Sequence, residues 1–286
     1  MNFRSDLALE CREPIAQENL DGLRGSEEDC GEYRVTRLEV YNEEGARVIG
    51  KPMGHYITIE LPPLGEYAEV FGDGMECAAS ELRRLLPGGD TVLVVGLGND
   101  SMTPDALGPR CCAQVLATRH ITGELAKSAG LGCLRPVSCL TPGVLGRTGI
   151  ESGELIAAAV RALRPAAVIT VDALAARSLS RLGCTIQITD NGIVPGSGVC
   201  NARLEISKNT LGVPVVALGV PTVVDAATLV ADLAETKDPP LASEGMMVTP
   251  REVDLLIERA AKLCAMAINR ALQPHLEVED FLALTE

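Results

Sequence analysis

The chain has 286 residues, of which 47% are apolar and 2% aromatic, and its formal net charge at pH 7 is −14. This length fits one large α/β domain or two small ones, and we favour one domain with an aliphatic core. No stretch combines clustered Lys and Arg with aromatic residues, so we expect no direct binding of DNA or RNA.

Ten cysteines and three histidines raise the question of a disulfide or zinc site. No two cysteines have C-x-x-C spacing, Cys111 and Cys112 are adjacent, and the histidines lack ligand-like spacing. We interpret the adjacent cysteines as small buried side chains and expect no metal and no cofactor. The chain shows no secretory signal and no apolar run of about 18 residues, which predicts a cytoplasmic protein in a reducing compartment, without membrane contact.

The first third of the chain predicts a polar N-terminal segment, two strands and a helix. Residues 1–31 are polar and acidic apart from a short apolar triplet, so we expect a mobile or loosely docked segment. Alternating patterns at 33–41 and 55–61 predict antiparallel strands with one face in solvent, joined by a turn at 50–54. Helical spacing follows at 72–86.

The segment TVLVVGLGNDSMTPDALGP, residues 91–109, organises the rest of the prediction. Its β-branched apolar run at 91–95 predicts a strand buried on both faces of a parallel sheet. Gly96 and Gly98 end this strand, so we expect a tight turn through Asn99 at the carboxyl edge, where open α/β sheets bind ligands.

The residues after this turn bring a carboxylate to the same edge. Thr103 followed by Pro104 is typical of a helix start, so Asp105 should lie at a strand-to-helix junction that faces a crevice. We expect an apolar helix over 104–120.

A second buried strand is predicted at 167–171, after a helix over 152–163, and it delivers Asp172 to its carboxyl end. The later elements are expected as follows: strands at 184–189 and 213–220, a glycine-rich segment at 190–199, an apolar helix through Leu233, and a long final helix from Thr249 and Pro250 that ends before Pro274. Together these elements predict an α/β domain with a largely parallel central sheet flanked by helices, plus antiparallel edge strands.

Three common site motifs are absent. The third glycine of a dinucleotide motif would fall at Ser101, and no Gly-Lys-Ser/Thr follows for a phosphate loop. Ser197 has Pro195 and Val199 where a serine hydrolase needs glycines.

The remaining arrangement is the pair Asp105 and Asp172, each delivered by a buried parallel strand to one sheet edge. Either aspartate could simply cap a helix or bind a backbone amide. Two carboxylates that share a site cannot both ionise easily, so one could keep a proton while the other activates water. The pair therefore indicates hydrolysis of a peptide bond without a metal.

Six segments of the sequence resemble the spore germination protease family, in order and over most of the chain. They are RSDLALE (4–10), GLGNDSMTPDALGP (96–109), VDALAARS (171–178), TDNGIVPGSGVCNAR (189–203), TLGVPVVALGVPTVVDA (210–226) and MVTPREVD (247–254). The resemblance implies an atypical aspartic endopeptidase that degrades small acid-soluble spore proteins in the spore core. It also implies a homotetramer, a fold similar to hydrogenase-maturation proteases, and catalytic residues at Asp105 and Asp172.

The same family is made as a zymogen that cleaves its own amino terminus after an acidic residue followed by an apolar residue and alanine. The resemblance therefore implies cleavage between Asp6 and Leu7, with residues 1–6 as a propeptide and 7–286 as the peptidase domain.

Cleavage after an acidic residue beside two carboxylates requires a fixed cation, because the acidic side chain would otherwise be repelled. Arg177 and Arg203 are the candidates, although either could pair with a structural acid. Asn99, Gly196 and Gly198 are candidates for substrate binding. The glycine-rich segment could donate backbone amides to an oxyanion or bind an extended peptide, or it could be only a loop.

Two other functions stay open at this point. One is a maturation-type peptidase for another protein substrate, which uses a metal held by that substrate. The other is a catalytically idle binding protein on the same fold, in which both aspartates are structural.

Overall fold

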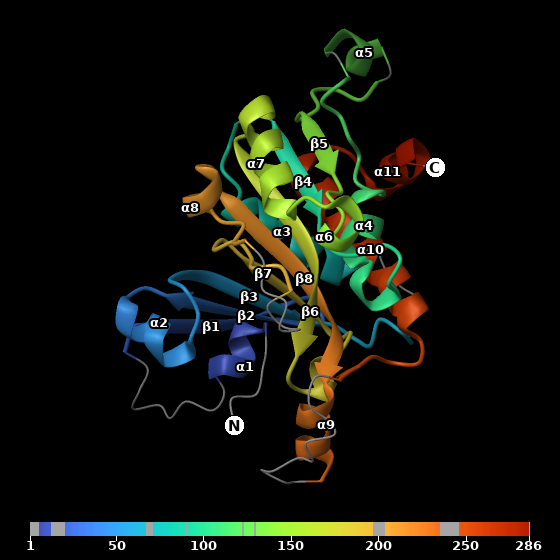
Figure 1. Cartoon of the computed structure of the whole chain (residues 1–286). Helices are drawn as coiled ribbons and strands as arrows, with labels where there is room; N and C mark the ends of the chain where they lie inside the picture. Colours follow the sequence, from blue (N-terminus) through green and yellow to red (C-terminus); the bar gives the residue numbers. More distant parts are fainter. Residues whose placement is uncertain are drawn as a thin grey trace.

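The computed structural model of the chain describes residues 6–12, 21–66, 71–89, 91–121, 123–128, 130–196, 204–234 and 246–285. Across these residues a nine-stranded sheet has the order β1-β2-β3-β7-β8-β6-β4-β5, and β9 pairs with β8. Helices pack on both faces of the sheet (Figure 1), so the predicted α/β class is confirmed.

One half of the sheet is parallel. It consists of β5 (Val137–Leu140), β4 (Val92–Gly96), β6 (Ala167–Ala176) and β8 (Val215–Asp225). The predicted strands at 91–95 and 167–171 are the two central members, β4 and β6. Their β-branched apolar residues suit positions that are covered on both faces, and every residue of β4 is buried.

The other half of the sheet is antiparallel. From β8 it continues through β7 (Thr185–Thr189), β3 (Gly54–Glu60), β2 (Tyr33–Val40) and β1 (Leu23–Cys30), while the short β9 (Met247–Val248) pairs with the far end of β8. The two alternating segments predicted as antiparallel strands are therefore confirmed as β2 and β3.

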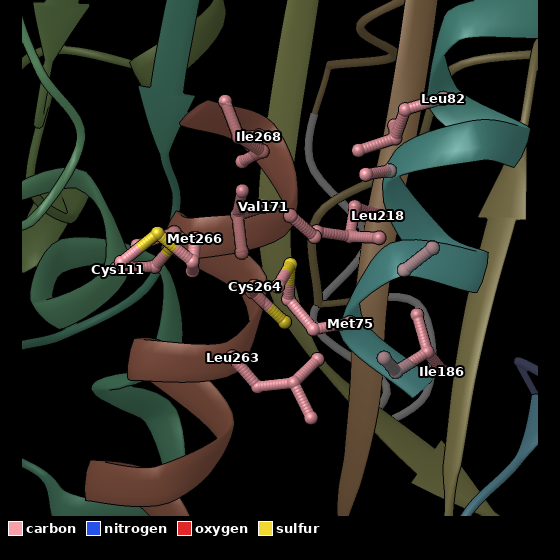
Figure 2. Close-up of a cluster of buried hydrophobic side chains, with 14 of the residues drawn as sticks. Met75, Leu82, Cys111, Val171, Ile186, Leu218, Leu263, Cys264, Met266 and Ile268 are labelled. Atoms are coloured by element: carbon pink, nitrogen blue, oxygen red, sulfur yellow. The ribbon is translucent and has the colours of Figure 1, made fainter. Parts of the chain in front are cut away.

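Alternation along β4 divides its side chains between two cores. Val92 and Val94 belong to the core formed with three helices, α3 (Asp73–Leu85), α4 (Leu107–Cys112) and α10 (Val253–Leu272), which Figure 2 shows against β6, β7 and β8. Leu93 and Val95 point the other way and pack with α7 (Ser152–Leu163). Two short helices, α1 (Ala8–Arg12) and α2 (Glu43–Ile49), pack on the antiparallel half.

The remaining described helices are short. They are η2 (Thr103–Asp105), α5 (Gly123–Ser128), α6 (Leu145–Thr148), η3 (Leu179–Arg181), α8 (Lys208–Leu211), α9 (Ala226–Leu233) and α11 (Val278–Thr285). The predicted helix through Leu233 and the predicted long final helix are confirmed as α9 and α10.

Three sequence expectations are wrong. The N-terminal segment 1–31 was expected to be mobile or loosely docked, but its described part contains β1, which pairs along its whole length with β2. This pairing uses main-chain hydrogen bonds, which need no apolar pattern. The helix expected over 104–120 ends at Cys112, because the chain turns to meet α10 and β5, with Leu116 N donating to Asn269 Oδ1 at 2.9 Å. The connection between β2 and β3 contains α2 in addition to a turn.

Cys30, at the end of β1, and Cys77, in α3, are joined by a disulfide. The sequence did not predict this disulfide, because it indicated a reducing compartment and contains no C-x-x-C spacing. The two cysteines are 47 residues apart in sequence. Cys111 and Cys112 are buried thiols, as expected. None of the helices in the described part of the chain has the length and apolar character that a bilayer-spanning segment needs.

Candidate active site

Asp105 lies where the chain turns back over the carboxyl edge of the sheet after β4. The turn is tight because Gly98 adopts a φ of +111°, and a side chain there would collide with the Asp105 main chain. Asn99 N donates to Asp105 Oδ2 at 2.8 Å, and Thr222 Oγ1 of β8 donates to Pro104 O at 2.7 Å. Burial raises the pKa of Asp105, and the hydrogen bond from Asn99 opposes this shift.

Asp172 lies within β6 rather than after its end. The strand was expected to end at Val171, but β6 and β8 continue to pair as far as Ala176 and Val224. The Asp172 side chain is 6% exposed, and its Oδ1 accepts a hydrogen bond from Ala173 N at 3.0 Å. Burial raises its pKa well above the ordinary value, and the carboxylates of Asp105 and Asp6 raise the pKa further.

The two aspartates line one cleft of about 740 Å³. They meet because β4 and β6 are parallel neighbours, with Gly96 level with Val171, so that both residues follow at the same edge. Asn99 and Gly196 line this cleft as well. Gly198 and Arg203 lie outside the described residues. A cleft with two carboxyl groups of raised pKa can supply both an acid and a base.

The N-terminal segment occupies the same region of the molecule. Asp6 lines the cleft, and its main-chain N donates to Ala175 O at 3.0 Å, while Ala175 N donates to Asp6 Oδ2 at 2.8 Å. Leu7 is 0% exposed and packs against Leu174 and Ala176 of β6. The segment predicted to contain the cleavage site is therefore anchored along β6.

Glu10, four residues after Asp6, is also held tightly. Its side chain is 2% exposed, and its two carboxylate oxygens accept hydrogen bonds from Arg177 N at 2.8 Å and Ser178 N at 2.9 Å. Arg181 Nε lies 3.7 Å from Glu10 Oε1. Arg177, a predicted cation for the substrate, thus contacts Glu10 through its main chain, and it is not among the residues that line the cleft.

Two polar residues at Asp6 were not found from the sequence. Gln187 Nε2 and Lys51 Nζ both donate to the main-chain oxygen of Asp6, at 2.9 Å and 3.2 Å. Gln187 lies in the otherwise apolar or hydroxyl-bearing strand TIQIT, where a buried amide was a usable signal. Lys51 follows α2 in a turn, and nothing in the local pattern marked it.

A smaller cavity of about 250 Å³ lies on the other side of Asp6. Lys51, Gln187 and Gly219 contribute to its walls, and Asp6 borders both this cavity and the cleft of the two aspartates. The described residues include no cluster of three or more His, Cys, Asp or Glu side chains that could hold a metal ion.

The fold is that of a mixed α/β protein with a cleft at the carboxyl edge of its parallel strands, lined by two carboxyl groups. Residues 5–237 match the family described as germination protease, and several curated germination proteases are similar over nearly the whole chain. The chain therefore belongs to the germination protease family, and it is a protease of spore germination.

The similar proteins come from several spore-formers. The germination protease of Clostridium perfringens is 39% identical, covering 98% of each chain, and that of Priestia megaterium is 35% identical, covering 99% of this chain and 97% of its own. The protein from Caldanaerobacter subterraneus is 41% identical over 96% of each. Among solved structures, a NiFe hydrogenase maturation protease from Thermococcus kodakarensis matches 66% of this chain and 98% of its own, with 19% identity and a TM-score of 0.37.

Proposed function

We propose that this protein is an aspartic endopeptidase that begins the degradation of small acid-soluble spore proteins during germination. We further propose that it is made as a zymogen, in which residues 1–6 are a propeptide and 7–286 the peptidase domain. The observation that carries the proposal is that Asp105, Asp172 and Asp6, the residue before the expected cleavage point, all line one cleft. Family membership supports the substrate class, a homotetramer and a location in the spore core.

The surroundings of the two carboxyl groups support different roles for them. Asp172 is nearly buried, and the neighbouring carboxylates favour its protonated form, so it is suited to be the acid. Asp105 is less buried, and Asn99 N donates to its carboxylate, which favours the ionised form suited to a base. Asp105 would take a proton from water as the water oxygen bonds to the carbonyl carbon, and Asp172 would protonate the leaving amine.

The docked N-terminal segment supports self-processing. Asp6, Leu7 and Glu10 are held by main-chain hydrogen bonds and by burial along β6, as an extended peptide substrate would be. Since Asp6 lines the cleft of its own chain, removal of residues 1–6 should be a first-order reaction whose rate is independent of protein concentration.

The test is to purify the full-length chain, incubate it under mildly acidic, dehydrating conditions, and follow the loss of residues 1–6 by mass spectrometry. Asp105→Asn and Asp172→Asn should each slow this loss by about 10²–10⁴-fold, the usual contribution of a general acid or base. Asp100→Asn changes an exposed aspartate of the same turn and should process at the parental rate.

Other outcomes distinguish the alternatives. Cleavage that stops when a chelator is added would favour a metal-assisted maturation-type peptidase. A full-length chain that cleaves neither its own terminus nor small acid-soluble spore proteins would favour the idle binding protein and overturn the proposal.

A further inference from the structure

Gln187 of β7 binds the N-terminal segment on both sides of Leu7. Its Nε2 donates to Asp6 O at 2.9 Å, and its Oε1 accepts from Ala8 N at 2.8 Å. A residue in a parallel neighbouring strand would form hydrogen bonds with the same two main-chain groups. Because the Gln187 side chain is 6% exposed, little water competes for these bonds, and the amide fixes the peptide next to the Asp6–Leu7 bond.

Lys51 brings a positive charge to the same oxygen. Its Nζ lies 3.2 Å from Asp6 O, which already accepts from Gln187, and a carbonyl oxygen has two lone pairs for two donors. The bond between Asp6 and Leu7 is the one expected to be cleaved, so this oxygen becomes negative when water adds to its carbon. Fixed donors at that point stabilise the developing charge, most of all when one is itself charged.

The sheet register places Gln187 two strands away from Asp172, on the other side of Gly219. Gly219 of β8 is level with Asp172 of β6 on one side and with Gln187 of β7 on the other. Residues that are level in neighbouring strands point to the same face, so Asp172 and Gln187 flank Gly219, with Cα atoms about 10 Å apart at two strand spacings. The Leu174 side chain covers Gly219, and Leu174 and Asp6 line both the cavity that Gln187 borders and the cleft that Asp172 borders.

We propose that Lys51 and Gln187 form the site that binds the oxygen of the scissile carbonyl, an inference that rests on the proposed peptidase function. Water loses a proton to Asp105 and bonds to the carbonyl carbon, and the electron pair of the C=O bond moves onto the oxygen beside Lys51. When the C–N bond breaks, the amine takes a proton from Asp172. Lys51 is then a catalytic residue, whereas Gln187 is a positioning residue that orients the carbonyl.

The experiment measures the first-order rate of loss of residues 1–6 in the full chain. Lys51→Ala should slow processing on the order of 10²-fold, as loss of one oxyanion donor does in other hydrolases. Added propylamine should raise the processing rate of Lys51→Ala at least about tenfold, because its ammonium group can occupy the space that the lysine side chain left. Lys51→Arg should keep part of the parental rate, because it retains a positive charge. Gln187→Met, which preserves length but removes both hydrogen bonds, should slow processing roughly 10-fold.

Matched controls are Lys208→Met on exposed α8 and Gln114→Met, which removes an amide bonded to Arg110 O outside the cleft. Both should process at the parental rate. If circular dichroism shows that Lys51→Ala does not fold, the processing rates of Lys51→Arg and Gln187→Met test the inference instead. If the Lys51 and Gln187 variants process at the parental rate while Asp172→Asn is inactive, the inference is overturned and the proposed peptidase function still stands. A parental chain that never processes would overturn the peptidase function on which the inference rests.

Discussion

The parallel and antiparallel halves of the sheet place different groups around Asp6, which borders both the cleft and the smaller cavity. The parallel half supplies the carboxyl pair, Asp105 after β4 and Asp172 in β6, and the pKa of each is raised. The antiparallel half supplies neutral or cationic hydrogen-bond donors, Gln187 from β7 and Lys51 from the turn before β3. Under the proposed function, the two halves would divide the chemistry: carboxyl groups come from the parallel half, donors to the Asp6 oxygen come from the antiparallel half, and Gly219 of β8 is level with a residue of each.

Apart from the loss of either aspartate, a substitution at the junction between the halves should have the largest effect on the processing rate. In Gly219→Ala the new Cβ would lie 2.6 Å from Leu174 Cγ and 2.8 Å from Asp172 O, so the strands must shift. Such overpacking destabilises by about 1–3 kcal/mol. A displacement of about 1 Å at a site can cost on the order of 10²-fold in rate. Urea unfolding and the processing rate measure the two effects, and an unchanged rate would show that the spacing of Asp172 and Gln187 is unimportant.

A smaller effect is expected at the distal anchor of the N-terminal segment. Glu10→Gln removes a buried charge that accepts two main-chain hydrogen bonds and lies near Arg181, and bonds to charged groups contribute about 1.5–3 kcal/mol. The amides of residues 7–12 should exchange hydrogen faster, and processing should slow roughly 10-fold, since 1.36 kcal/mol corresponds to tenfold. Glu27→Gln, at an exposed position in β1, is the control. Unchanged exchange would show that Glu10 does not anchor the segment.

The smallest effect should be a pH dependence of stability that belongs to the parallel half. The pKa of Asp172 is raised in the folded chain, chiefly by burial, so the folded state holds this proton more tightly than the unfolded state. The resulting stabilisation is complete below the ordinary pKa of 3.8 and is lost as pH rises through the raised value.

The free energy of unfolding of the parental chain should therefore decline over that pH window, and Asp172→Asn should lack this part of the decline. Urea titrations at intervals from about pH 4 to about pH 8 measure it. Gln187→Met, in the antiparallel half, replaces a group that does not titrate. Its free energy of unfolding should therefore decline with pH as that of the parental chain does. Identical pH profiles for Asp172→Asn and the parental chain would contradict the burial of this carboxyl group.

Much of the fold followed from local pattern. The apolar runs that became β4 and β6 are buried on both faces, and the periods that became α3, α7 and α10 are long enough to identify helices without tertiary information. The exposed strand β1 could not be predicted in this way, because its residues are held by pairing with β2 and carry no alternating apolar signal. The end of α4 was missed because contacts with α10 and β5 stop that helix.

The candidate site was predicted only in part. Asp105 and Asp172 were found because each comes after an apolar run, a feature of the local sequence, and the structure brings both to one cleft. Lys51 and Gln187 were missed because they contact Asp6 across 45 and 181 residues of sequence. Arg177, predicted as the cation for an acidic substrate side chain, contacts Glu10 through its main chain, and that role stays a prediction, whereas Lys51 contacts the main-chain oxygen of Asp6.

By itself the sequence determined the α/β class, the two central strands and the two aspartates that come after their apolar runs, because apolar periodicity and turn residues act over a few neighbouring positions. Only the tertiary structure decided that β6 extends beyond Asp172, that Asp6 and Leu7 are held along this extension, and that Gly219 is level with both Asp172 and Gln187. These features depend on strand register and on hydrogen bonds between distant segments, and no local pattern encodes which strand lies beside which.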